Sequence, residues 1–309
     1  MKTLPAACLI LLPAIAAAQS ASVWPEGKRA AVSLTFDDAR PSQLDAGLPL
    51  LEKLGVRATF FVSVNNLEKR LDGWKRAIGA GHEIGVHGYL HMQVHRVSPE
   101  DFRSEVERGK KLLEDLIGAP VAGHRAPAFS ITPATRWALD ILVDAGFQYD
   151  SSIYPIAGKR YGWPGFPLDI QRLTLADGRT IIEAPLSVAH LGGKALPCCG
   201  GGYLRLFPYA YTRWALRQIE RRRPAIVYLH PYEFDTEAPP EDFAAATRRA
   251  PLKARLFNAR LWLRRRSVWP KFRRLVGEHS FTSLGDIIRR TEEGGGIAVS
   301  PLPGTTMKS

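Results

Sequence analysis

Short runs of apolar residues, rich in β-branched and aromatic side chains, recur along the chain and predict strands. They cover residues 31–36, 57–62, 83–86, 180–184 and 225–229. Because most of their side chains are apolar, we expect these strands to lie in the interior of the molecule.

Three stretches have helical periodicity and end at a glycine, at residues 43–54, 99–117 and 134–145. The second has a clear start signal, because Ser98 is a good N-cap residue and Pro99 suits the first position of a helix. Gly118 is a typical residue just after the end of such a helix. Strands that alternate with helices predict an α/β fold in which helices cover a parallel sheet.

The length of the chain fits one large domain, since α/β barrels commonly run to about 250 residues as a single unit. We see no linker before residue 290 and expect one domain over residues 21–290, with a basic helical part at its carboxyl end. Residues 291–309 contain the glycine run 294–296, and we expect them to be a disordered tail.

The first twenty residues have the pattern of a secretory signal peptide. Lys2 supplies a positive start, residues 4–18 are free of charge, and three alanines at 16–18 suit cleavage. An uncleaved anchor is the alternative, but the apolar run is shorter than the roughly 20 residues that a bilayer span needs. We therefore expect an exported protein, periplasmic or secreted.

The chain is basic, with 42 Lys and Arg against 30 Asp and Glu and a net charge of +12. Much of the excess lies in a basic segment, residues 248–274, where leucine and tryptophan interleave with the cations. Such a segment could contact an anionic envelope surface, or it could be the solvated face of a helix packed on the domain. We expect no nucleic-acid partner, because no nucleic-acid-binding motif is present. The oligomeric state stays open.

Only two cysteines remain outside the leader, and they are neighbours, Cys198 and Cys199. Adjacent residues cannot staple distant segments. We expect ordinary thiols in a glycine-rich loop, while a strained vicinal disulfide, a soft metal site and intermolecular pairing are the alternatives.

Polar side chains follow several of the predicted strands, which is where β/α barrels carry their chemistry. Asp37 and Asp38 end the first run, and His87 and His91 follow the third. Two imidazoles four positions apart and a carboxylate can form a three-ligand metal site with an open position for water or substrate. A second carboxylate beside it could deprotonate that water. His82, His95, His124 and His190 could be extra ligands, but we expect them to be hydrogen-bonded structural groups.

Five segments together resemble the successive motifs of the polysaccharide deacetylase family, also called the NodB-homology family or carbohydrate esterase family 4. They are TFDD at 35–38, HGYLH at 87–91, HRAP at 124–127, YDSS at 149–152 and LHP at 229–231. The resemblance covers residues 31–231. The segment GGGYLRLFPY at 200–209 further resembles a bacterial subgroup associated with exopolysaccharide production.

This resemblance implies a distorted (β/α) barrel that removes acetyl groups from an N-acetylated polysaccharide with a divalent cation, usually zinc. Asp38, His87 and His91 would be the metal ligands. Asp37 would be the general base, held by Arg125; its alternative role is to orient a ligand. His230 would protonate the leaving amine, and Asp150 would pair with His230.

The same resemblance implies a set of substrate contacts. Leu229 would line the pocket for the acetyl methyl group, and the backbone N–H of Ala128 would bind the oxyanion. Tyr161 and Trp163 could stack on sugar rings.

Three positions depart from the family's pattern. Gly88 replaces a hydroxyl residue that usually braces the ligand loop, which predicts a weaker metal site. Ala128 replaces a tyrosine and would open the substrate groove. The residues after Asp150, Ile153-Tyr154-Pro155, lack the usual tryptophan.

Two other functions compete with this one. The same metal chemistry would hydrolyse a small amide or an O-acetyl ester. A non-catalytic carbohydrate-binding protein could also retain this fold.

Overall fold

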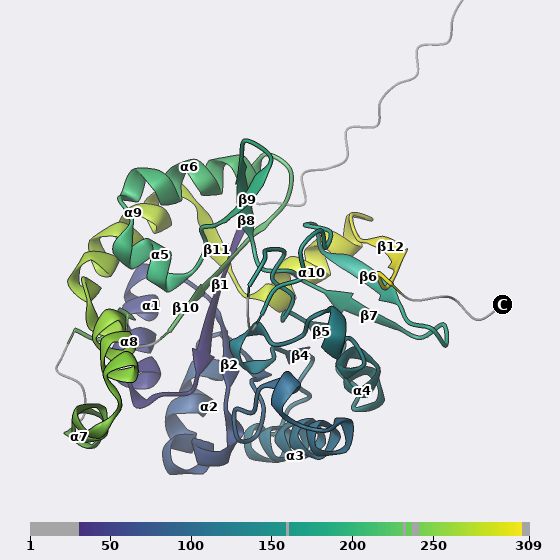
Figure 1. Cartoon of the computed structure of the whole chain (residues 1–309), viewed down its shortest axis with the longest axis horizontal. Helices are drawn as coiled ribbons and strands as arrows, with labels where there is room; N and C mark the ends of the chain where they lie inside the picture. The colour runs from purple at the N-terminus through teal and green to yellow at the C-terminus, as the bar shows by residue number, and fades with distance from the viewer. Residues whose placement is uncertain (1–30, 159–160, 231–232, 237–240, 305–309) are drawn as a thin grey trace, which may run out of the picture.

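The computed structural model describes residues 31–158, 161–230, 233–236 and 241–304 (Figure 1). The predicted leader at residues 1–20 lies outside the described residues. Within the described ranges, no helix combines the length and the apolar character that crossing a bilayer requires.

The described residues form a ten-stranded sheet in the order β10-β1-β2-β3-β4-β5-β7-β6-β12, with β11 paired to β1. Its strands are β1 (Ala31–Asp38), β2 (Thr59–Val62), β3 (Glu83–Val86), β4 (Gly123–His124), β5 (Tyr149–Asp150), β6 (Gln171–Thr174), β7 (Thr180–Glu183), β10 (Ala225–Leu229), β11 (Ser280–Thr282) and β12 (Ala298–Pro301). All neighbours are parallel except β6 and β7. A separate hairpin joins β8 (Val188–Leu191) to β9 (Lys194–Pro197). The predicted α/β fold with a parallel sheet is confirmed.

Helices surround this sheet (Figure 1). They are α1 (Leu48–Leu54), α2 (Leu71–Gly79), α3 (Pro99–Ile117), α4 (Ala138–Asp144), α5 (Gly201–Leu206), α6 (Tyr209–Glu220), α7 (Glu241–Arg249), α8 (Leu252–Trp262), α9 (Val268–Glu278) and α10 (Leu284–Glu293). The capping signals of α3 act as predicted, since the Ser98 side chain accepts a hydrogen bond from Asp101 N–H and Gly118 is left-handed.

The side chains of β1 alternate between two environments, as a strand requires. Val32, Leu34 and Phe36 belong to the large apolar cluster between the sheet and the helices. Thr35 and Asp37 point to the opposite face, where both contact Arg125. One strand therefore supplies core packing on one face and polar groups on the other.

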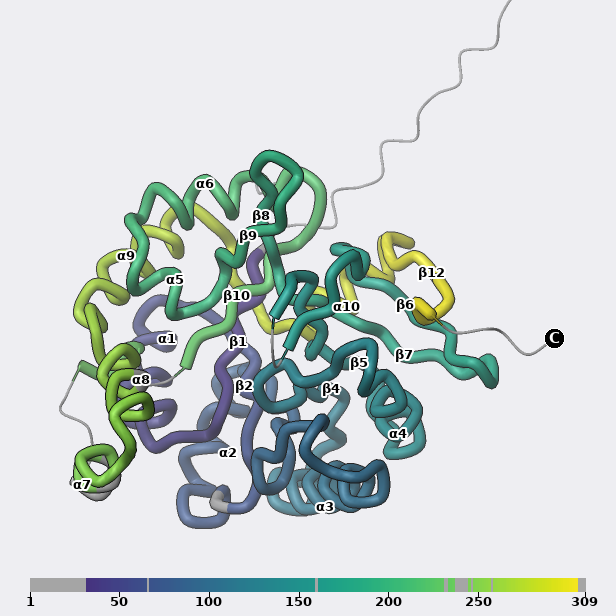
Figure 2. The backbone as a smooth tube through the Cα atoms, in the orientation of Figure 1, coloured from purple at the N-terminus to yellow at the C-terminus, as the bar shows by residue number. Residues whose placement is uncertain are grey.

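The basic segment, residues 248–274, divides into a packed part and an exposed part. Helix α9 buries Val268, Phe272 and Leu275 against the domain, as the packed-helix alternative predicted. Helix α8 instead leaves Leu252 and Leu256 exposed. Figure 2 shows α7 and α8 at one edge of the molecule, on the side opposite β6, β7 and β12.

The prediction of disorder from residue 291 is wrong for the described residues 291–304. Helix α10 continues to Glu293, and β12 then pairs in parallel with β6. The reason is that β6 would otherwise be an open edge of the sheet, whose backbone groups β12 satisfies. Gly295, with a φ of 69°, lets the chain turn back toward that edge.

Cys198 and Cys199 are free thiols in the structure and are both buried, with 3.3 Å between their sulfur atoms. The hydrogen bond between them and their burial raise the pKa of Cys199 well above its usual value. Burial removes the exposure that intermolecular pairing would need.

Candidate metal centre and active site

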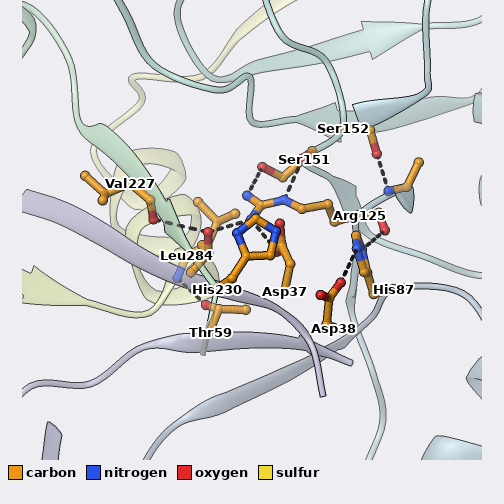
Figure 3. Close-up of polar contacts among 12 residues, drawn as sticks. Asp37, Asp38, Thr59, His87, Arg125, Ser151, Ser152, Val227, His230 and Leu284 are labelled. Carbon is orange, nitrogen blue, oxygen red and sulfur yellow. Dashed lines mark hydrogen bonds and ion pairs between the residues drawn. The ribbon is translucent and has the colours of Figure 1, made fainter. Parts of the chain in front are cut away.

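The residues with candidate chemistry meet at the carboxyl ends of the parallel strands. Asp37 and Asp38 end β1, His87 follows β3, Arg125 follows β4, and His230 follows β10. Strands that run in the same direction bring these ends to one face of a barrel. Figure 3 shows the carboxylate of Asp37 directed toward Arg125 and that of Asp38 toward His87.

Asp38, His87 and His91 bring one donor atom each to within 4.8 Å of one another. Oδ1 of Asp38 lies 3.2 Å from Nε2 of His91 and 3.8 Å from Nε2 of His87. Nδ1 of His87 lies 2.7 Å from the carbonyl oxygen of Arg125, so Nδ1 carries the proton and Nε2 offers its lone pair to the site. This donor set fits a divalent cation.

The electrostatics favour the protonation states that a metal requires at Asp38 and His87. At His91 burial lowers the pKa, but the hydrogen bond and the charge of Asp38 outweigh it and raise the pKa above its usual value. Burial lowers the pKa of His87 to about 4, against the opposing charge of Asp37. Burial alone would raise the pKa of Asp38, but the hydrogen bond from His91 and the charge of His230 hold that pKa well below its usual range. Near neutral pH Asp38 is therefore ionised and His87 neutral, as ligands must be.

Several residues of the site have a left-handed backbone that side chains other than glycine rarely adopt. The φ angles are 95° at Asp38, 61° at His91 and 55° at Ala128. Such conformations cost of order 1–3 kcal/mol each and persist where the surrounding structure imposes them. Their clustering here is typical of a functional site.

The ligand loop is braced by a residue that the sequence did not point to. Oε1 of the buried Glu105, on α3, accepts the N–H of Leu90 at 2.6 Å. Gly88 has a φ of 80°, and a Cβ there would lie 3.2 Å from the same oxygen. Glu105 thus supplies a brace of the kind that the missing hydroxyl at Gly88 would have provided.

Asp37 and Arg125 form a buried ion pair, with 3.0 Å between Oδ1 and Nη1. The guanidinium also donates to the backbone oxygen and the hydroxyl of Ser151, at 2.9 and 2.8 Å, and to the hydroxyl of Thr35. Its plane lies over the ring of Phe61, 4.3 Å from the centroid. These contacts hold Arg125, and through it the carboxylate of Asp37, in one position.

The predicted pairing of Asp150 with His230 is wrong. Oδ1 of Asp150 lies 2.7 Å from Nδ1 of His124, and both residues are fully buried. Tyr149 on β5 faces the barrel interior, so Asp150, the next residue, faces the helix layer, where His124 packs against Phe102 of α3. His124 is the structural histidine that we expected.

Glu233 is the carboxylate that the structure places beside His230. It is almost fully buried, and its Oε2 accepts the backbone N–H of His230 at 2.9 Å. Burial raises the pKa of Glu233, while the charges of His230 and Arg205 oppose that rise. The sequence offered one signal for this contact, because Glu233 stands three positions after His230, but we did not use it.

Two glycines at the start of α5 allow this arrangement. A Cβ at Gly200 would overlap the ring of Tyr228, and a Cβ at Gly201 would overlap the carboxylate of Glu233. The glycine-rich segment therefore lets α5 approach the end of β10 closely.

We expect Gly201→Ala to displace Glu233 and with it the His230 segment. Overpacking of this kind costs about 1–3 kcal/mol, which a urea unfolding curve would measure. Gly202→Ala is the matched control, because its Cβ would meet only Arg205, at 3.8 Å. Equal stability of the two variants would show that the contact between Gly201 and Glu233 is not tight.

A cleft of about 570 Å³ opens beside the candidate metal ligands and is lined by His91, Gln93, Ala128, Phe129, Tyr161, Gly202, Tyr203, Arg205, Leu206, Phe207, Tyr228, His230, Arg260 and Leu261. Two of the predicted substrate contacts, Ala128 and Tyr161, are among these residues. Their roles toward a substrate stay predictions.

The other two predicted substrate contacts do not reach the cleft. Leu229 is fully buried in the cluster between sheet and helices, because side chains alternate along β10 and its neighbour Tyr228 takes the inner face. Trp163 is buried in the same cluster as Leu229, with its ring 5.2 Å from that of Phe166. We correct both predictions accordingly.

Two family models match successive segments of the chain. A polysaccharide deacetylase model matches residues 25–149, and a domain of unknown function, DUF3473, matches residues 151–289. The first segment contains Asp37, Asp38, both candidate histidine ligands and Arg125, while His230 lies in the second.

Curated proteins and solved structures agree with this match. A peptidoglycan-N-acetylglucosamine deacetylase of Bacillus cereus is 36% identical over 116 residues, which cover 36% of this chain and 42% of that protein. A peptidoglycan deacetylase of Helicobacter pylori is 29% identical over 106 residues, 34% of this chain and 35% of that protein. The matches thus span less than half the length of these relatives. A crystal structure from Mycobacterium smegmatis, assigned by name to the polysaccharide deacetylases, has a TM-score of 0.57 at 19% identity and covers 93% of this chain and 97% of that chain. This likeness confirms the predicted distorted (β/α) barrel.

Proposed function

Residues 25–149 of this chain match the polysaccharide deacetylase family, and from that premise we propose that the chain is a metal-dependent hydrolase of N-acetyl groups on a polysaccharide. One observation supports this most directly. A three-donor set, Asp38, His87 and His91, lies beside a buried carboxylate, Asp37, at the mouth of a cleft.

We propose zinc as the cation, because two imidazoles and one carboxylate suit it. When bound, a divalent cation supplies Lewis acidity that lowers the pKa of water and polarises a carbonyl group. Asp38, His87 and His91, whose donor atoms lie within 4.8 Å of one another, would hold it.

Asp37 takes the proton of the attacking water as general base. Arg125 pairs with this carboxylate at 3.0 Å and directs it, since a buried carboxylate without a partner would be costly. The alternative role of Asp37, orienting a ligand, requires the same contact.

His230 gives a proton to the leaving amine as the C–N bond breaks, which yields free acetate and a sugar amine. In place of Asp150, Glu233 holds the His230 segment through the N–H of His230. The backbone N–H of Ala128, a residue that lines the cleft, binds the oxyanion.

The location and the partners of the enzyme are also proposals. We propose export of the protein, on the evidence of residues 1–20. The exposed leucines of α8 among cations support contact of this region with an anionic envelope surface.

Acetate release by the purified chain from acetylated glucosamine oligomers and polymers tests this function. We expect release with zinc, loss after treatment with a chelator, and recovery when zinc is restored. Release that persists in chelator would contradict the metal requirement. If no sugar releases acetate, a small amide or an O-acetyl ester becomes the substrate to test at the same site.

A further inference from the structure

We propose that the glycan taken by this site carries an anionic group next to the deacetylated sugar, and that Arg260 binds that group. The inference rests on the proposed function and names the substrate class of the same site. It follows from the lining of the cleft beside the metal ligands.

The cleft is apolar and aromatic along much of its wall. Phe129, Tyr161, Tyr203, Phe207 and Tyr228 all line it. Their rings pack on one another, with Tyr203 stacked on Phe207 and Phe129 set edge-on against Tyr228. Flat aromatic walls of this kind suit the apolar faces of sugar rings. The volume of about 570 Å³ lies within the range typical of ligand sites.

The charge of the cleft is one-sided. Among the described residues that line it, none is an aspartate or a glutamate, while Arg205 and Arg260 are both present. A cleft with cations and no lining carboxylate raises the local concentration of anionic ligands.

Arg205 is already engaged by the protein. It is buried, its Nη1 donates to the carbonyl oxygens of Arg260 and Leu261, and its Nε lies 3.8 Å from Glu233. The contacts of Nη1 tie the last turn of α8 to the cleft wall, while Nε makes no hydrogen bond among the described residues and lies beside the carboxylate of Glu233. Arg205 is therefore buried and paired with Glu233, and it positions the backbone of Arg260.

The side chain of Arg260 differs from that of Arg205 in its surroundings. It is exposed, and within the described ranges no carboxylate forms an ion pair with its guanidinium. Its backbone is fixed by Arg205, at 2.8 Å from Nη1 to the carbonyl oxygen. Arg260 thus lines an aromatic cleft and can offer the N–H groups of its guanidinium to a ligand. Such a group suits a carboxylate or another oxyanion.

The experiment compares two polymers that differ only in charge. One alternates N-acetylglucosamine with glucuronic acid, and the other is the same polymer with its carboxyl groups reduced to alcohols. We expect kcat/KM for acetate release to be about tenfold higher on the acidic polymer, as one charge-assisted contact provides. Added salt should shrink this preference.

Arg260→Gln should bring the ratio of the two kcat/KM values close to one. Arg255→Gln is the matched control, because Arg255 is an exposed arginine of the same helix that does not line the cleft. It should keep the preference of the unchanged chain, although it removes the same net charge. Equal turnover of both polymers by the unchanged chain, or a preference that survives in Arg260→Gln, would overturn the proposal.

The failure of the proposed function can be told apart from the failure of this inference. If the unchanged chain releases acetate from neither polymer, the proposed function fails. Binding can then be measured by calorimetry, with both polymers, for the unchanged chain, Arg260→Gln and Arg255→Gln. This measurement tests the role of Arg260 without requiring turnover. Tighter binding of the acidic polymer that only Arg260→Gln loses supports it, and any other pattern overturns it.

Discussion

We expect Asp37→Asn to lower kcat for acetate release by roughly 10²- to 10⁴-fold, the usual contribution of a general base. The amide keeps the shape of the carboxylate and an oxygen that can accept from Arg125, but it cannot take a proton from water. Because Asp37 lies outside the three-donor set, metal binding should persist. Steady-state kinetics and metal content of the purified variant measure the two effects separately.

The control for this variant is Asp72→Asn, which makes the same change on the exposed surface of α2. It should leave both kcat and metal content unaltered. If Asp37→Asn keeps most of its turnover, Asp37 is not the base, and its role is limited to orienting a ligand.

His87→Ala should remove both the metal and the activity. Loss of a residue that merely supports a ligand costs about 10–100-fold in metal affinity, so loss of a ligand should cost more. The substitution also deletes the buried contact between Nδ1 and the carbonyl oxygen of Arg125, which ties the metal loop to the strand that carries the arginine. Zinc titration and acetate release provide the two measurements.

His95→Ala is the matched control, because His95 is exposed and lies outside the donor set. Circular dichroism of both variants separates metal loss from unfolding. A folded His87→Ala protein that binds zinc as tightly as the unchanged chain would remove His87 from the metal site.

The α/β alternation and several of the central strands and helices could be predicted from the sequence. The apolar runs at 31–36, 83–86 and 225–229 became β1, β3 and β10, and the helix at 99–117 became α3. Caps and periodicity are local signals, so they need no knowledge of distant contacts. The three-donor set could also be predicted. Asp38 ends one strand, and both histidines lie in the short loop that follows a second strand, β3.

The pairing partners of the site could not be predicted. Asp150 follows a strand just as Asp37 does, yet it faces the helix layer and binds His124. Along a strand of two residues, the sequence alone does not tell which side chain takes which face. Leu229 was predicted to line the acetyl pocket, but it lies in the apolar cluster between sheet and helices, and Tyr228 lines the cleft instead.

The sequence by itself determined the alternation of strands and helices. It also determined that a carboxylate and two histidines stand at or just after the ends of strands. What only the tertiary structure decided is which of these groups meet. Glu105 braces the ligand loop from α3, and Arg260 lines the cleft from α8, where Arg205 of α5 holds its backbone. Such contacts depend on packing between elements, and packing is set by the shape and volume of all the side chains together.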